Sequence, residues 1–167
     1  MVIEIGKARS YEMIDLRKKI ISMIVDSPEL VHLLGEDDSD DPAESIPFNK
    51  VFPHEYIPEV ITETKRFLNF EINAYSNGTN DVYKNLTIIF YVVCHKDVVR
   101  YKEKGREYLW YDKVVCALDE LFSDNNTLTV KKMGLDSNVA YYPQDKFKGR
   151  AVVFTTMDYS NGKKYGK

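Results

Sequence analysis

The chain has 167 residues, 44% of them hydrophobic and 29% charged, and a formal net charge of −3. These values predict one soluble globular domain with a buried core, and the mildly acidic balance argues against a dedicated nucleic-acid-binding protein. No window approaches the roughly 18 apolar residues of a membrane helix, and the N-terminus lacks the apolar core of a signal peptide. We therefore expect an intracellular protein whose Cys94 and Cys116 are buried, reduced thiols.

The first elements of the chain read as helices. Ser10 is a candidate N-cap, and apolar residues from Met13 to Val25 recur at helical spacing, which predicts a helix over residues 10–25. A second short helix follows, because Ser27 can cap it, Pro28 suits its first position and Gly35 suits its end.

An acidic segment comes next, with five carboxylates in the six residues 36–41. Calcium binding is one interpretation, but the segment lacks the glycine and the terminal glutamate of a helix–loop–helix calcium site. We expect a solvated, mobile acidic loop over residues 36–45. Three prolines then predict an extended, non-helical arm over residues 46–58.

The middle of the chain predicts an antiparallel hairpin. Residues 66–76 (RFLNFEINAYS) alternate between apolar and polar, and residues 86–94 (LTIIFYVVC) are apolar on both faces. The segment SNGTN between them supplies turn residues. In the second strand, Ile89, Tyr91 and Val93 lie on the face opposite Ile88, Phe90 and Val92. Either the helices 10–25 and 108–122 cover one face each, or a neighbouring subunit covers part of this surface.

The C-terminal half predicts a helix over residues 108–122 and two strands, TLTVKKMGL and RAVVFTTMDYS. An aromatic loop, VAYYPQDKFKG, lies between them, and residues 160–167 form a polar tail that we expect to be flexible. The fold class predicted for the single domain 1–167 is α+β, with a mostly antiparallel sheet of four to five strands packed with the N-terminal helix and one central helix.

No catalytic, metal or cofactor motif is present: there is no glycine-rich phosphate loop, no GxSxG and no HExxH. Cys94 and His95 cannot jointly bind one ion, because neighbours in a strand point to opposite faces. We therefore expect no enzyme activity, no metal and no cofactor, and an interaction surface instead. A basic cluster within residues 96–107, predicted as a solvated loop, is a candidate surface for DNA or an acidic partner: Lys96, Arg100, Lys102, Lys104 and Arg106.

The order of elements resembles a known family. The stretch LRKKIISMIVDSPELVHLLG resembles the start of tail terminator (tail completion) proteins of long-tailed bacteriophages. In these proteins an extended stretch like KVFPHEYIP follows, then a hairpin like FLNFEINAYSN and DVYKNLTIIFYVVCH, a helix like YDKVVCALDELF and a final strand pair. The resemblance covers residues 10 to 160 and rests on element order and loose motifs.

This resemblance implies a structural virion protein that forms a hexameric ring on the head-proximal end of the tail tube and ends tube polymerisation. It implies as partners the tail tube protein, a head-closure or connector protein, and genomic DNA passing through the lumen without sequence-specific binding; no membrane is implied. Alternatives are a head-closure or neck adaptor ring, the cap of a phage-tail-like contractile particle, or a small cytosolic enzyme or ligand-binding domain using His54 and His95. Candidate inter-subunit residues are Phe52, His54, Tyr56, Ile89, Tyr91 and Val93.

Overall fold

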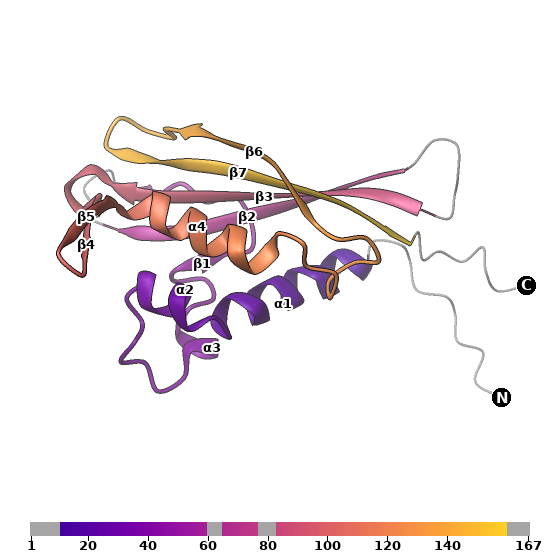
Figure 1. Ribbon diagram of the computed structural model, residues 1–167, viewed down its shortest axis with the longest axis horizontal. Helices are drawn as coiled ribbons and strands as arrows, with labels where there is room; N and C mark the ends of the chain where they lie inside the picture. Colours follow the sequence, from indigo (N-terminus) through magenta and orange to yellow (C-terminus); the bar gives the residue numbers. More distant parts are fainter. Residues whose placement is uncertain (1–10, 60–64, 77–82, 160–167) are drawn as a thin grey trace, which may run out of the picture.

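A computed structural model describes residues 11–59, 65–76 and 83–159 (Figure 1). The predicted N-cap Ser10, most of the predicted turn SNGTN and the tail 160–167 lie outside the described residues. Within the described ranges, the fold is α+β, with five strands in one sheet of order β1-β2-β3-β7-β6. The predicted fold class is therefore confirmed.

The helical start of the chain follows the sequence prediction. Helix α1 spans Tyr11–Val25 and α2 spans Pro28–Leu33. The hydroxyl of Ser27 accepts from the Leu30 amide (3.4 Å), and Gly35 ends the turn with a φ of +76°, a value that favours glycine. The predicted acidic loop is shorter than expected, because α3 occupies Pro42–Ser45 and the Asp41 carboxylate caps it at the Ala43 amide.

The predicted hairpin forms the centre of the sheet. Strands β2 (Arg66–Ser76) and β3 (Tyr83–His95) pair antiparallel, and β3 also pairs antiparallel with β7 (Phe147–Tyr159). The predicted arm 46–58 holds only the short strand β1 (Val51–Phe52), which runs parallel to β2. Arg17 of α1 contacts both the Pro53 carbonyl oxygen and the Glu71 carboxylate, so the arm is fastened to its own chain.

Two regions differ from the sequence prediction. Residues 96–107 are not a loop: a short 3-10 helix (Lys96–Val98) leads into an antiparallel hairpin of β4 (Arg100–Glu103) and β5 (Arg106–Leu109). The strand predicted at residues 127–135 is also misplaced. Strand β6 spans Gly134–Tyr141 and pairs with β7, so it takes up part of the predicted aromatic loop.

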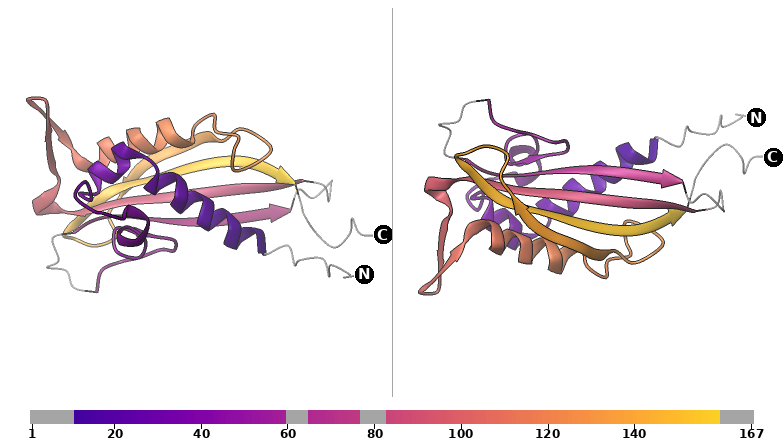
Figure 2. Two further views of the ribbon diagram at one scale, coloured as in Figure 1. Left: turned by 90° about the horizontal axis from the view of Figure 1, so that it is seen from below. Right: turned by 90° about the horizontal axis from the view of Figure 1, so that it is seen from above.

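Helix α4 spans Trp110–Phe122, and the helices of the described ranges lie on one face of the sheet (Figures 1 and 2). The view from below places α1 and α4 in front of the strands, and the view from above shows the strands uncovered (Figure 2). The core between α1, α4 and the sheet contains Phe70, Phe90, Phe122 and Phe154, each 0% exposed. Of the two alternatives left open by the sequence, the one in which the two helices cover one face each is therefore wrong.

The start of α4 is anchored to the N-terminal helices by a buried side chain. Trp110 is 0% exposed, and its indole Nε1 donates to the Leu33 carbonyl oxygen at 2.7 Å. This bond satisfies the indole donor and a carbonyl oxygen in the last turn of α2. It fixes the position of the β4–β5 hairpin, which ends directly before Trp110.

Candidate interaction surfaces

The face of the sheet that carries no helix, here called the open face, is only partly covered. Its side chains alternate with those of the core, and it includes five residues on three adjacent strands: Thr87, Ile89, Tyr91, Val139 and Val153. All are half-buried except Val139, which is 53% exposed. Apolar side chains left accessible on neighbouring strands are typical of a contact surface.

One end of the open face is covered by side chains of the arm. An aromatic cluster of Phe52, Tyr56, Phe67, Val93 and Phe147 covers it. The rings of Phe52 and Tyr56 stack at 3.9 Å, and Phe67 meets both edge-on. The arm therefore packs on its own sheet, and the open face extends from this cluster toward the far end of the sheet.

The structure separates the predicted inter-subunit residues into two groups. Phe52 and Val93 are 7% and 0% exposed, so their side chains offer no surface. His54 is exposed within the arm, whereas Tyr56, Ile89 and Tyr91 are half-buried. The inter-subunit role stays a prediction for the residues of the second group.

A tyrosine pair borders the open face and the aromatic cluster. The rings of Tyr91 and Tyr141 lie 4.7 Å apart, and the Tyr141 hydroxyl donates to the Glu55 carboxylate at 3.5 Å. Burial, and then the negative charge of Glu55, raise the pKa of Tyr141 to about 12, and the same causes raise the pKa of Tyr91. Both phenols are therefore neutral hydrogen-bonding groups at physiological pH.

Strand β6 forms one edge of the sheet. No other strand of the described residues pairs with its outer side, which is therefore an edge to which a further strand could add. Leu135 and Val139 are 41% and 53% exposed, and the register shifts between Leu135 and Ser137. Sequence reasoning missed this edge, because the segment GLDSNVAY is mostly polar or small.

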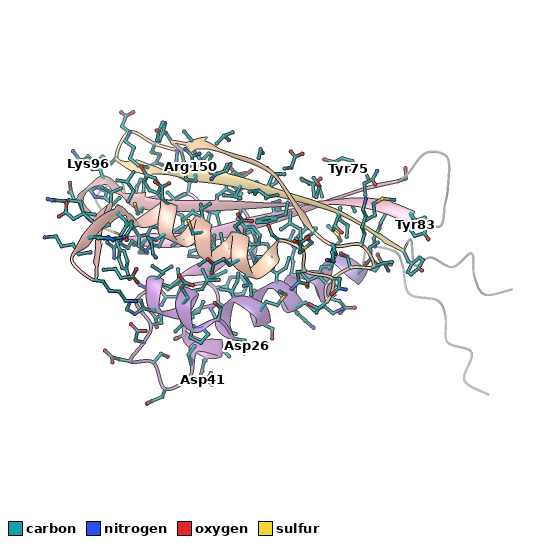
Figure 3. All side chains as sticks on the ribbon, in the orientation of Figure 1. Asp26, Asp41, Tyr75, Tyr83, Lys96 and Arg150 are labelled. Atoms are coloured by element: carbon teal, nitrogen blue, oxygen red, sulfur yellow. The ribbon has the colours of Figure 1, made fainter. Side chains whose placement is uncertain are left out.

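The predicted basic cluster lies on the β4–β5 hairpin and the 3-10 helix before it. Lys104 and Gly105 form the turn with φ values of +48° and +77°, which suit a two-residue hairpin turn. At the other end of the sheet, Figure 3 shows Tyr75 and Tyr83, far from Lys96. The hairpin therefore extends the molecule at one end and carries the basic residues there.

Part of the hairpin's positive charge is neutralised locally. Glu107 accepts from Arg100 at 2.8 and 3.0 Å and lies 3.3 Å from the Lys102 ammonium group. These two cations lower the pKa of Glu107, and Lys113 lowers the pKa of Glu103. Among the described residues no carboxylate lies within ion-pair distance of Lys96, Lys104 or Arg106.

His32 connects the acidic segment to the hairpin. Its Nδ1 lies 2.7 Å from the Asp37 carboxylate, and its Nε2 lies 3.0 Å from the Tyr101 hydroxyl. Glu36 lies 3.8 Å from the Lys50 ammonium group. The acidic segment is therefore held by contacts within the chain, rather than being wholly solvated.

Cys94 and His95, at the end of β3, are both buried but do not form a reactive pair. Burial raises the pKa of Cys94 to about 12, with a smaller opposing effect of Arg66. The thiol is therefore protonated at neutral pH and a poor nucleophile. Cys116 is exposed on α4, so the prediction that both thiols are buried is wrong for Cys116.

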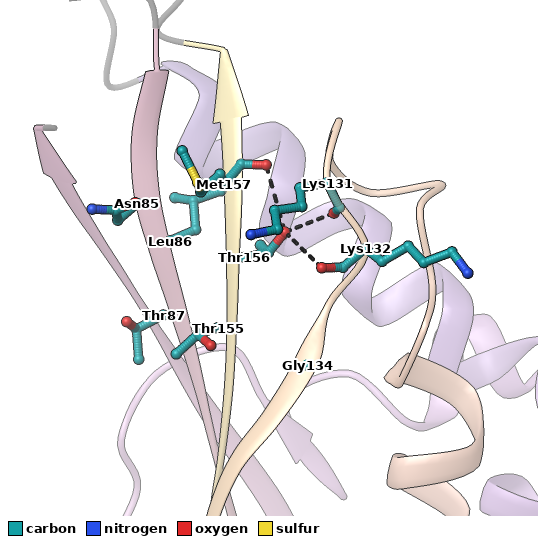
Figure 4. Close-up of a pocket in the computed structure, with 9 residues that line it drawn as sticks. All are labelled: Asn85, Leu86, Thr87, Lys131, Lys132, Gly134, Thr155, Thr156 and Met157. Carbon is teal, nitrogen blue, oxygen red and sulfur yellow. Dashed lines mark hydrogen bonds between the residues drawn. The ribbon is translucent and has the colours of Figure 1, made fainter. Parts of the chain in front are cut away.

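A cavity of about 440 Å³ lies where the chain enters β6 (Figure 4). Lys131, Lys132, Thr155 and Thr156 contribute to its lining. The hydroxyls of Thr129 and Thr156 lie 2.9 Å apart, and each donates to the Lys131 carbonyl oxygen at 2.7 Å. These hydrogen bonds hold the chain in place where it enters β6. They also give each buried hydroxyl a hydrogen-bond partner.

Neither a membrane span nor a metal cluster is found in the described part of the chain. Its helices are too short or too polar to cross a bilayer. No group of three or more His, Cys, Asp or Glu residues in the same ranges is arranged to hold a metal ion.

Comparison with known families adds an identification. The model of the YomW family matches residues 27–156, from the cap of α2 to near the end of β7. The chain belongs to the YomW family. The matched region includes the open face, the β6 edge and the β4–β5 hairpin, whereas α1 precedes it. No match is found among curated proteins.

Proposed function

We propose that this protein is a structural virion protein that forms a ring on the head-proximal end of a phage tail tube. The observation that carries the proposal is the open face with the unpaired β6 edge beside it. A subunit that closes into a ring needs two different surfaces for its neighbours, and each must tolerate burial. The open face and the outer edge of β6 are the candidates for these two surfaces, because apolar side chains of β3 and β7 stay accessible on the face and the edge has no strand partner among the described residues.

Two further findings support the proposal. The order of elements that resembles tail terminator proteins is largely present in the structure, with the hairpin β2–β3 followed by α4 and a closing strand pair. Membership of the YomW family is consistent with a phage or prophage origin. In this proposal the ring ends tube polymerisation and provides the contact to the head connector.

The test uses purified protein mixed with the tail tube protein of the same phage, with tube ends viewed by negative-stain microscopy. We expect rings on one end of each tube and shorter tubes as the protein concentration rises. Val139→Lys should prevent ring formation, because a lysine on an edge strand opposes further strand pairing.

The matched control is Ile14→Lys on α1, since Ile14 is 50% exposed and Val139 is 53% exposed. Rings that form equally well with both variants, or tubes that grow normally with the wild-type protein, would refute the proposal. Binding to filled heads without binding to tubes would instead identify a head-closure ring.

A further inference from the structure

A second cavity, of about 460 Å³, lies at the base of the β4–β5 hairpin. It is bounded by the end of α2 near Gly35, the start of β2 and the 3-10 helix before β4. Its charged lining residues are four cations and one carboxylate: Lys50, Lys65, Arg66, Arg100 and Asp97. We call it the basic cavity. An excess of cations is notable in a chain with a net charge of −3.

Arg66 provides a fixed positive charge in this cavity. Its Nε donates to the Val98 carbonyl oxygen at 2.9 Å, its Nη2 donates to the Arg100 carbonyl oxygen at 2.8 Å, and the guanidinium lies 5.6 Å from the Trp110 ring centre. Within the described residues, no carboxylate lies at ion-pair distance from it. These neutral partners orient the guanidinium without cancelling its charge.

Two of the other cations, Lys50 and Arg100, have acidic partners outside the cavity lining. The Lys50 ammonium group lies 3.8 Å from Glu36, a long contact between partly exposed side chains. Arg100 donates to Glu107, which also lies near Lys102 and belongs to the hairpin outside the cavity. An anion inside the cavity would meet the guanidinium of Arg66, further cations from separate segments and one carboxylate, Asp97, and it would compete with Glu36 for Lys50 and with Glu107 for Arg100.

From this arrangement we propose that the basic cavity binds a phosphate-bearing anion. Its volume lies in the range of about 300–1,000 Å³ that is usual for ligand pockets. Low-dielectric walls and like charges focus the positive potential inside a concave site. A phosphate has several oxygens, so it can accept hydrogen bonds from an arginine and lysines at once. The inference goes beyond the proposed tail-end function and does not depend on it.

The test is calorimetric titration of the full chain with inorganic pyrophosphate, together with backbone amide NMR to locate the ligand. We expect saturable binding, with shifts at Leu34, Gly35 and Val98. The double variant Lys50→Gln/Lys65→Gln should weaken binding by about tenfold or more, because it removes two of the four positive charges that line the cavity.

The matched control is Lys18→Gln/Lys19→Gln, which removes the same charge from two exposed residues of α1. It should keep the wild-type affinity within about twofold, which corresponds to less than about 0.5 kcal/mol. Thermal unfolding of both double variants checks that the fold is intact. As a second probe of the site, Arg66→Lys keeps the charge but loses the guanidinium, and it should also weaken binding.

A second titration identifies the source of the phosphate. If a short DNA duplex displaces pyrophosphate and the lysine variant lowers its salt dependence, the ligand is a nucleic-acid backbone. If pyrophosphate alone binds, it is a small phosphate compound. Absence of saturable binding, equal loss in both double variants, or tighter binding of hexaglutamate than of pyrophosphate would each overturn the proposal.

Discussion

The two faces of strand β3 carry similar side chains but differ in how deeply those side chains are buried. Ile88, Phe90 and Val92 are 0% exposed beneath α1 and α4, whereas Ile89 and Tyr91 are half-buried on the open face. The difference comes from what packs against each face and not from the strand, because both sets are apolar. Burial of the first face in the main core stabilises the fold, and the part of the second face that holds Ile89 and Tyr91 remains available for a partner.

The largest difference between the faces should appear on truncation. Phe90→Ala should lower the free energy of unfolding by about 3–5 kcal/mol, because Phe90 contacts the rings of Phe70, Phe122 and Phe154 in the core. Ile89→Ala, one residue away on the open face, should cost about 1 kcal/mol. Urea unfolding of both variants measures this, and equal losses would mean that the open face is packed as tightly as the core.

The second-largest expected loss of stability comes from a close backbone contact between β7 and β3. A Cβ added at Gly149 would lie 1.9 Å from the Val92 carbonyl oxygen, so Gly149→Ala must displace one of the two strands. We expect a loss of about 3 kcal/mol. Gly134→Ala on the edge strand is the control, because nothing lies within 4 Å of its added Cβ. If thermal unfolding shows the same change for both glycines, close strand approach does not explain Gly149.

The different burial of the two cysteines can be tested by their reactivity. Cys94 lies in the core with its pKa raised to about 12 by burial, and Cys116 is exposed on α4. A thiol reagent at pH 8 should modify Cys116 quickly and Cys94 only after unfolding. Mass spectrometry of Cys116→Ala should therefore show an unmodified native protein. Rapid modification of that variant would contradict the burial of β3.

The smallest effect concerns alkaline stability at the border of the open face. Burial and Glu55 raise the pKa of Tyr141 from 10.0 to about 12, so the folded state favours the neutral phenol. The resulting stabilisation is complete below pH 10 and is lost as the pH rises from 10 to about 12. Tyr141→Phe should lose less stability over this interval than the wild-type protein.

The control for this pH effect is Tyr142→Phe, at a neighbouring side chain that is 60% exposed. Chemical unfolding at pH 9 and 11 should give the wild-type difference for this variant. A reduced difference in both variants would assign the effect to tyrosines in general and not to the pair of Tyr141 with Glu55.

Several elements could be predicted because their signals are local. The caps and apolar spacing of α1 and α2 act within a few residues, and the predicted antiparallel pairing of β2 with β3 is confirmed. Among the candidate site residues, Lys104 and Arg106 are exposed as expected, whereas Phe52 and Val93 are not on the surface. A hydrophobic pattern identifies which side chains are favourably buried, but it does not identify the segment that packs against them.

Other features depended on partners distant in sequence. Strand β6 exists because β7 offers hydrogen bonds to a segment with weak strand propensity, and β4–β5 exists because a two-residue turn closes a charged segment. The basic cavity was also out of reach, since Lys50, Lys65 and Arg100 come from separate segments. Clusters of charge along the sequence do not show which distant charged residues the fold brings together.

The sequence by itself determined that this protein is an α+β domain built around an antiparallel hairpin, because helical and strand periodicities are written in neighbouring residues. Only the tertiary structure decided that both long helices lie on the same face of the sheet. That choice depends on packing between distant elements, through contacts such as Trp110 with Leu33 and Arg17 with Glu71. The open face, and with it the candidate surface for assembly, is a consequence of that packing.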